Sequence, residues 1–226
     1  MIVDVIIPAY NEQDSVGKVI ADIPKKLVRD IIVVNNASND LTPKIAEESG
    51  ATVLFEKEKG YGAACLKAIN YIREKETKPD VLVFLDADYS DHPEEMEKLL
   101  AEIQNGFDLV IGSRENENRE KGSMTPQQIF GNKLATYLLK VLYGIHFSDL
   151  GPFRAIRWTS FQDLDMCDRN WGWTVKMQLK AGKKKLKYTE IPVSYRKRIG
   201  VSKVSGTLKG TIMAGYKIIY TIFKYR

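Results

Sequence analysis

Short apolar runs alternate with helical patterns along the first half of the chain, and this alternation limits the fold more than any other feature. The apolar runs predict strands at Val3–Ile7, Ile31–Asn35, Thr52–Phe55, Val81–Leu85 and Leu109–Ile111. The runs are continuous, as in parallel strands that helices cover on both faces. Helical patterns lie between them at Ser15–Ala21, Thr42–Glu48, Ala63–Glu74 and Pro93–Gln104. We therefore expect βαβ units and an α/β fold with a mostly parallel central sheet.

The second half of the chain has a different pattern. A polar stretch, residues 114–128, leads into an amphipathic helical pattern at Gln127–Tyr143. The segment Leu208–Arg226 is also amphipathic, with Ile212, Tyr216, Ile219, Tyr220 and Phe223 on one face and Lys209, Lys217 and Lys224 on another. Lysines interrupt it too often for a transmembrane helix, which needs roughly 20 apolar residues. We expect one domain over 1–207 and an amphipathic helix over 208–226 that either lies in a membrane interface or docks on its own domain.

Charge is distributed unevenly along the chain. From Lys180 to Arg226 there are 13 Lys and Arg against one acid, Glu190, a net charge of +12 in a chain whose total is +5. The rest of the chain therefore carries −7. A basic region on an acidic body favours phosphate groups, an anionic membrane surface or nucleic acid as partner, and a solvated lysine-rich face is the alternative. No nucleic-acid-reading module is evident, so we expect no nucleic-acid partner.

Several classes of protein are excluded by the motifs that the sequence lacks. It contains neither the glycine-rich P-loop nor the G-x-S-x-G of serine hydrolases. The two cysteines, Cys65 and Cys167, are far apart and outside any C-x-x-C, which argues against a disulfide scaffold or a zinc finger. A signal peptide would begin with basic residues, but here Asp4 is acidic and the apolar run stops at Pro8. We expect a cytoplasmic protein.

Polar residues follow three of the predicted strands, where an open parallel sheet binds its ligands. These segments are Pro8-Ala9-Tyr10-Asn11-Glu12, Asn35-Asn36-Ala37-Ser38-Asn39-Asp40 and Asp86-Ala87-Asp88. Asp86 and Asp88 leave a buried strand at i and i+2, and such carboxylates suit Mg²⁺ or Mn²⁺ bridging to phosphates. The alternative is an acidic turn or helix cap. We also expect Gly62, before a helix, to permit close approach of the backbone to a ligand.

Taken in order, the motifs resemble family 2 glycosyltransferases of the GT-A fold. The segments that carry the resemblance are IIPAYNE, the acidic DAD, GSR at residues 112–114, SDLGPFRAIR and EIPVSYRKRIGVSKVSG. The likeness covers about residues 2–210 and is greatest to the polyprenyl-phosphate sugar transferases of the dolichyl-phosphate mannose synthase type. It implies a nucleotide-sugar-binding fold and metal-assisted, inverting transfer of a sugar from a nucleoside-diphosphate sugar to a polyprenyl phosphate.

The resemblance also implies roles for individual residues. The nucleotide sugar would be bound by Pro8, Ala9, Tyr10, Glu12, Asn36, Asp40, Gly62, Asp86, Ala87 and Asp88. Asp88 would be the direct metal ligand, with Asp86 also near the metal and closer to the sugar or ribose. The residues nearest the reaction would be Asp88, Asp149 and Arg114. The donor and acceptor phosphates would be held by Arg114, Arg154, Arg196, Arg198, Ser202 and Lys203.

Two segments depart from the family pattern. Asn35-Asn36-Ala37-Ser38 stands where the family has Asp-Asp-Gly-Ser, and Lys176 stands where an acid is expected. A hydroxyl acceptor needs a general base, whereas a phosphate acceptor is already anionic. Lys176 and the basic region therefore favour a lipid phosphate, on the cytoplasmic face of a membrane. Two alternatives stay open: transfer to a saccharide or protein hydroxyl with Asp149 as base, and a protein that binds nucleotide sugars without catalysis.

Overall fold

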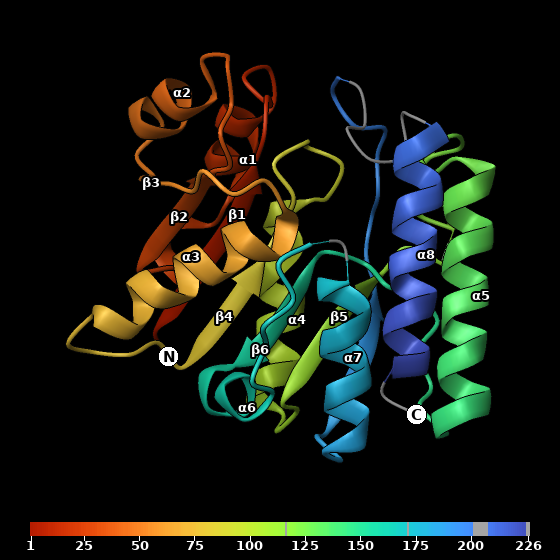
Figure 1. The fold of residues 1–226 in the computed structure, drawn as a ribbon. Coiled ribbons are helices and arrows are strands. Elements are labelled where there is room, and N and C mark those ends of the chain that lie inside the picture. The colour runs from red at the N-terminus through yellow and green to blue at the C-terminus, as the bar shows by residue number, and fades with distance from the viewer. Residues whose placement is uncertain (116, 171, 201–207, 225–226) are drawn as a thin grey trace.

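The computed structural model of the chain confirms the α/β architecture (Figure 1). It describes residues 1–115, 117–170, 172–200 and 208–224, the last range by backbone alone as far as residue 214. Within these residues, seven strands form one sheet in the order β3-β2-β1-β4-β6-β5-β7. The strands are β1 Val3–Ala9, β2 Asp30–Asn35, β3 Thr52–Phe55, β4 Val81–Phe84, β5 Leu109–Ser113, β6 Arg154–Arg157 and β7 Tyr188–Pro192.

Helices cover both faces of the sheet, as the continuous apolar strands predict. Successive side chains of a strand point to opposite faces, so Ile6 packs into one core and Val5 into the other. The first core includes residues of α3, α5, α6 and α7, and the second includes residues of α1, α2 and α4. The helices are α1 Val16–Asp22, α2 Thr42–Glu48, α3 Tyr61–Glu74, α4 Met96–Gln104, α5 Pro126–Tyr143, α6 Trp158–Asp163, α7 Trp173–Lys183 and α8 Leu208–Lys224. Short 3-10 turns lie at η1 Lys25–Leu27 and η2 Pro93–Glu95.

Two strands, β6 and β7, were not predicted from the sequence, and β6 makes the sheet mixed. β6 lies between β4 and β5 and runs antiparallel to both. Its first residue, Arg154, pairs with Phe84, the last residue of β4. The segment that enters β6 therefore lies at the carboxyl end of β4, next to Asp86 and Asp88.

The C-terminal helix α8 packs against α5 and α7. Figure 1 shows α5 and α8 side by side at one edge of the molecule. The Tyr143 hydroxyl at the end of α5 donates a hydrogen bond to the Ile222 carbonyl, and Ile222 is fully buried. The predicted apolar face of α8 is exposed where its side chains are described: Tyr216, Ile219, Tyr220 and Phe223 are 37–62% exposed. No helix in the described part of the chain is long and apolar enough to span a membrane.

Candidate functional site

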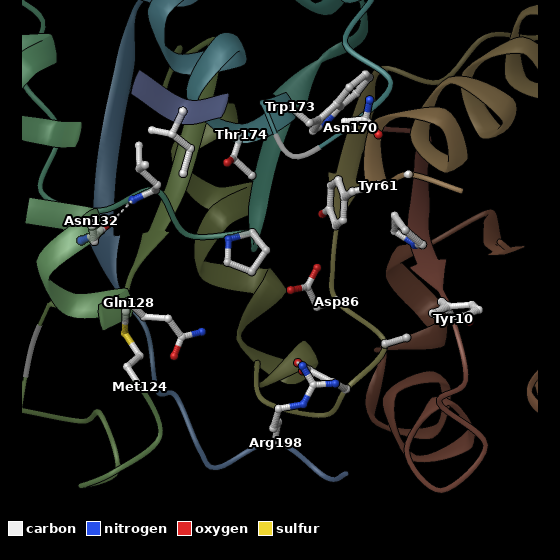
Figure 2. Close-up of a pocket in the computed structure, with 18 of the residues that line it drawn as sticks. Tyr10, Tyr61, Asp86, Met124, Gln128, Asn132, Asn170, Trp173, Thr174 and Arg198 are labelled. Atoms are coloured by element: carbon white, nitrogen blue, oxygen red, sulfur yellow. Dashed lines mark hydrogen bonds and ion pairs between the residues drawn. The ribbon is translucent and has the colours of Figure 1, made fainter. Parts of the chain in front are cut away.

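A pocket of about 630 Å³ opens at the carboxyl ends of β1, β2 and β4. Figure 2 shows Asp86 near its centre, with Tyr10 on one side and Gln128 and Asn132 of α5 on the other. Ten of the predicted site residues line it: Pro8, Ala9, Tyr10, Glu12, Asn36, Asp86, Ala87, Asp88, Arg114 and Arg198. Five lie elsewhere: Asp40, Gly62, Asp149, Arg154 and Arg196. Ser202 and Lys203 fall outside the described residues.

Asp86 and Asp88 follow β4 directly, because the buried strand ends at Phe84 and the chain turns at the sheet edge. Asp88 accepts hydrogen bonds from the backbone N–H (3.0 Å) and the hydroxyl of Ser90. Its other oxygen lies 3.0 Å from a guanidinium nitrogen of Arg198. Burial, together with the neighbouring Asp88 carboxylate, raises the pKa of Asp86 to about 7. The two carboxylates thus differ. Asp88 is paired with the Arg198 guanidinium, whereas the raised pKa of Asp86 disfavours its ionised form, which a bound cation would stabilise.

A third carboxylate, Asp91, lies close to this pair, two residues before the predicted helix at Pro93–Gln104. It is 2% exposed, and neither side-chain oxygen has a hydrogen-bond partner among the described residues. Burial, Asp86 and Asp88 raise the pKa of Asp91. The residue that caps the following turn is instead His92. Asp91 forms an isolated β-bridge with Tyr195, more than 100 residues away, so the local sequence carries no signal for this contact.

Arg198 and Arg196 come from the same segment after β7 but have different surroundings. The guanidinium of Arg198 binds Glu12 at 2.6 Å and Asp88 at 3.0 Å, so it spans the mouth of the acidic pair. Arg196 instead donates from Nε to the Tyr89 carbonyl (2.7 Å), and its guanidinium lies 3.4 Å from the centre of the Tyr89 ring. Arg198 can therefore reach a phosphate in the pocket, whereas Arg196 holds the turn that follows Asp88.

Arg114 and Asp149 form a buried ion pair beside the pocket. Asp149 accepts hydrogen bonds from Nε (2.8 Å), a terminal guanidinium nitrogen (2.7 Å) and the backbone N–H (2.8 Å) of Arg114. Burial opposes ionisation of Asp149, but the charge and hydrogen bonds of Arg114 outweigh it and hold the pKa of Asp149 below its usual value. Asp149 is fully buried and only Arg114 lines the pocket. Asp149 therefore orients Arg114, and it is poorly suited to accept a proton from a bound substrate.

Arg154 and Lys176 are both buried and contact other parts of the protein. Arg154 is 1% exposed and donates to the backbone carbonyls of Leu150, Gly151 and Thr174. Burial lowers its pKa to about 10. Lys176 is buried on α7, with its ammonium nitrogen 3.0 Å from the Cys167 sulfur. Neither side chain lines the pocket, so Lys176 has no direct bearing on the acceptor.

The end of the pocket next to β2 is built around Asn36. Its amide nitrogen donates to the carbonyls of Glu56 (3.1 Å) and Glu58 (2.6 Å), and its amide oxygen accepts from the Gly60 N–H (2.7 Å). Asn36 therefore holds the loop at 56–60, and this loop places Lys59 in the pocket. The Lys59 ammonium donates to the Tyr10 hydroxyl (3.0 Å) and lies 4.7 Å from the centre of its ring. Lys59 was not predicted, since it stands in a charged loop without a motif.

Asp40 and Gly62 support this end of the pocket from outside. Asp40 accepts hydrogen bonds from Thr42 and from the Gln13 N–H. A β-carbon at Gly62 would lie 1.9 Å from the Asp168 carbonyl oxygen. The close approach that this glycine permits is thus to the chain itself, not to a ligand as we expected.

The chemistry of the donor set fits a divalent cation that shares its ligands with a substrate. Mg²⁺ is usually held by one or two carboxylates together with substrate phosphates. Asp86 and Asp88 supply two carboxylates, and no group of three or more metal-ligating side chains occurs within the described ranges. Arg114 and Arg198 add two guanidinium groups that suit phosphate oxygens. The arrangement can hold a diphosphate between a metal and two arginines.

Comparison with known proteins identifies the family. The model of glycosyl transferase family 2 matches residues 4–171. An uncharacterized glycosyltransferase of Mycobacterium tuberculosis is 34% identical over 214 residues, which cover 94% of each chain. The undecaprenyl-phosphate mannosyltransferase of Micrococcus luteus is 29% identical over 220 residues, covering 91% of this chain and 88% of that protein.

The fold comparison agrees with the sequence relatives. A solved structure of glucosyl-3-phosphoglycerate synthase from Mycobacterium tuberculosis, in complex with Mn²⁺, UDP-glucose and phosphoglyceric acid, matches with a TM-score of 0.78 at 21% identity. The match covers 98% of this chain and 78% of that one, so the GT-A fold is confirmed. The chain belongs to glycosyl transferase family 2, and it is a glycosyltransferase.

Proposed function

We propose that this glycosyltransferase moves a sugar from a nucleoside-diphosphate sugar to the phosphate of a polyprenyl phosphate, with Mg²⁺ or Mn²⁺ and inversion at the anomeric carbon. One observation carries the proposal. The carboxylates that line the pocket, Glu12, Asp86 and Asp88, come from the strand ends of the nucleotide side. Among the described residues, the opposite wall contributes no carboxylate to the pocket.

The opposite wall is made by α5, α7 and the segments before α7 and β6. Its polar groups are amides and a hydroxyl, from Gln127, Gln128, Asn132, Asn170 and Thr174. None of these side chains can act as a general base near neutral pH. An acceptor that arrives already anionic needs no base on this side, and a phosphate monoester is such an acceptor. Asp149, the base candidate for a hydroxyl acceptor, is bound by Arg114 through three hydrogen bonds.

The donor side supports a nucleoside diphosphate. Tyr10 and Lys59 provide an aromatic ring and an ammonium group at the nucleoside end, and Arg114 and Arg198 approach the phosphates. The relative named as an undecaprenyl-phosphate mannosyltransferase and the neighbour solved with Mn²⁺ and UDP-glucose support this choice of donor, metal and acceptor class. Asp86 and Asp88 would hold the metal, which when bound neutralises charge on the departing diphosphate.

In the proposed reaction, an oxygen of the acceptor phosphate attacks the anomeric carbon as the bond from that carbon to the diphosphate oxygen breaks. The electron pair of the broken bond leaves with the nucleoside diphosphate, and no proton has to be removed. Arg198 turns from Asp88 toward the diphosphate, while Asp149 keeps Arg114 in a fixed orientation beside it. Preorganised positive charge of this kind stabilises the transition state without reorganisation during the step.

Transfer to a hydroxyl is the second candidate, and one observation favours it. Asp86 has a pKa raised to about 7, by burial above all, and a carboxylate of this kind can accept a proton near neutral pH. Asp86 lies on the metal side of the pocket, however, where a bound cation would lower its pKa again. A phosphate acceptor avoids this conflict.

We place the protein at the cytoplasmic face of a membrane, with α8 as an interfacial helix that follows the catalytic domain of residues 1–207. The basic region from Lys180 onward supports this placement, and so do the exposed aromatic residues of α8. An anionic membrane would also supply the lipid acceptor.

A donor screen tests the proposal. Purified protein is incubated with Mg²⁺ or Mn²⁺, UDP- and GDP-sugars, and a polyprenyl phosphate, and the lipid is analysed by mass spectrometry. We expect a mass gain of one sugar from one donor, lost in Asp88→Ala and kept in the matched control Asp163→Ala, which removes an exposed carboxylate on α6. Binding of a nucleotide sugar without any lipid product, with transfer to a hydroxyl acceptor instead, would overturn it.

A further inference from the structure

We infer that the pocket opens sideways between α5 and α8 at Gly131 and Gly215, and that the hydrocarbon chain of a lipid-phosphate acceptor passes through this opening onto the outer face of the two helices. The inference rests on the proposed function and adds a binding site for the chain of the acceptor. It makes Gly131 and Gly215 specificity-determining residues.

The opening lies where two helical glycines face the pocket. Gly131 of α5 and Gly215 of α8 both line the pocket, and both are partly exposed to solvent. A β-carbon at either position would have no described neighbour within 4 Å, apart from its own helix backbone. At the other end the helices are in contact, since Tyr143 donates a hydrogen bond to Ile222. The two helices are thus in contact near their C-terminal ends, and at the two glycines no described side chain fills the space beside them.

An apolar surface continues from this opening. Phe130 and Tyr216 adjoin the two glycines in sequence and are 69% and 62% exposed. Tyr137 and Val141 on α5 extend the exposed surface along the helix, and the α8 residues Ile219, Tyr220 and Phe223 do so on its neighbour. A run of large exposed apolar residues on two adjacent helices is unusual on a monomer and marks a contact surface. We call these seven exposed residues of the two helices the α5/α8 face: Phe130, Tyr137, Val141, Tyr216, Ile219, Tyr220 and Phe223.

The inside of the pocket changes character toward the opening. Ile218 of α8, three residues after Gly215, lines the pocket as an apolar residue, whereas the carboxylates Glu12, Asp86 and Asp88 follow β1 and β4. Trp173, drawn in Figure 2, also lines the pocket. It is 1% exposed, and its indole N–H has no hydrogen-bond partner in the described part of the chain.

The occupant that fits is an isoprenoid chain leaving a membrane, because the α5/α8 face is apolar and aromatic and exposed lysines lie on the same two helices. Lys133 and Lys140 on α5 and Lys224 on α8 are exposed among the apolar residues. Tyrosines and lysines around an apolar stripe suit the interface of an anionic bilayer. A lipid phosphate in such a bilayer has its phosphate group in the interface, where these tyrosines and lysines would lie, and its chain in the hydrocarbon core. The opening would pass the phosphate inward to Arg114 and Arg198.

Substitutions at the two glycines test the inference with little risk to folding, since both positions are helical, have free space and gain helix propensity when glycine is replaced. We compare wild type, Gly131→Leu, Gly215→Leu and the control Gln104→Leu, which adds an exposed leucine to α4. Each is assayed with undecaprenyl phosphate and with geranyl phosphate, and donor affinity is measured by calorimetry. We expect kcat/KM for the long-chain acceptor to fall by about tenfold or more in the glycine variants, which is ~1.4 kcal/mol. Donor affinity should stay close to wild type, and transfer to geranyl phosphate, whose chain is much shorter, should fall clearly less than transfer to undecaprenyl phosphate.

Each outcome decides one claim. If wild type transfers to undecaprenyl phosphate and both glycine variants match it, the opening is wrong and the proposed function stands. If wild type transfers only to hydroxyl acceptors, the proposed function fails and the inference fails with it. Equal losses with both acceptors, or a loss of donor affinity, would show a general disturbance of the pocket and would also overturn the inference.

Discussion

Replacing Asp149 by Asn separates a positioning role from a catalytic one. Asp149 is fully buried and accepts three hydrogen bonds from Arg114, at 2.7–2.8 Å. Asn keeps the size but loses the charge, and its amide nitrogen must face a donor of Arg114. The substitution therefore leaves a buried guanidinium without its counter-charge.

The loss of stability expected for Asp149→Asn follows from the burial of its ion pair with Arg114. Removing one partner of a buried ion pair costs about 3–5 kcal/mol, because the remaining charge stays in a low dielectric. For a chain of this size, each kcal/mol lowers the Tm by about 2–4 °C, so we expect Asp149→Asn to lower it by roughly 6–20 °C. The exposed Asp163→Asn is the matched control and should shift the Tm by little.

The pH dependence of the same variant has a defined sign. The folded pKa of Asp149 is depressed, so its contribution to stability is present above the unfolded value of about 3.9 and is lost as the pH falls through the folded pKa. The difference in free energy of unfolding between wild type and variant should be constant at neutral pH and should shrink below about pH 4. Denaturant titrations at a series of pH values measure it.

Activity below the melting transition completes the test. Loss of a general base costs about 10²–10⁴ in rate. A positioning role instead predicts a smaller loss of kcat together with weaker donor binding, because Arg114 is no longer held. Full stability and normal donor affinity with turnover abolished would refute the reasoning and would make Asp149 the base.

Three further predictions concern the pocket and its surroundings. Arg198→Gln frees Asp88 from its 3.0 Å ion pair, so Mn²⁺ should bind the donor-free protein a few-fold more tightly, by about 1 kcal/mol. Sugar transfer should fall sharply. Weaker Mn²⁺ binding in calorimetry would contradict this prediction. Lys59→Ala removes the contact with Tyr10 and should weaken nucleotide-sugar binding roughly fivefold, or about 1 kcal/mol, with kcat little changed; an unaltered Kd would exclude Lys59 from the donor site. Phe223→Ser should reduce flotation with anionic vesicles and leave the Tm within about 1–2 °C, since Phe223 is 47% exposed, whereas equal flotation would argue against a membrane on this helix.

The predicted strands and helices of the first half are present, because each depends on local patterning. Ile6 and Val5 already indicate a strand buried on both faces, and the pattern at Thr42–Glu48 gives helix α2 at those bounds. β6 could not be predicted in the same way. It has four residues with an arginine at each end, and it is a strand only because β4 and β5, distant in the sequence, pair with it.

The site residues, too, could be predicted only where a local pattern indicates them. Asp86, Asp88 and Arg198 meet in the pocket, as expected from strand ends and motif order. Arg154 belongs to a motif that predicts a phosphate ligand. Its guanidinium instead donates hydrogen bonds to backbone carbonyls of the loop before β6. Lys59 enters the pocket through a loop that Asn36 holds, which no local pattern reveals. Arg154 and Lys59 were misjudged because hydrogen bonds made in the folded chain decide where these two side chains lie.

The central claim is that the acceptor group is a phosphate, and a comparison of two lipids tests it most directly. With one donor and one metal, transfer is measured to a polyprenyl phosphate and to the polyprenol of the same chain length, which ends in a hydroxyl. Because the acceptor wall among the described residues offers amides and a hydroxyl but no carboxylate, we predict sugar transfer to the phosphate alone. Equal or faster transfer to the polyprenol would contradict the account.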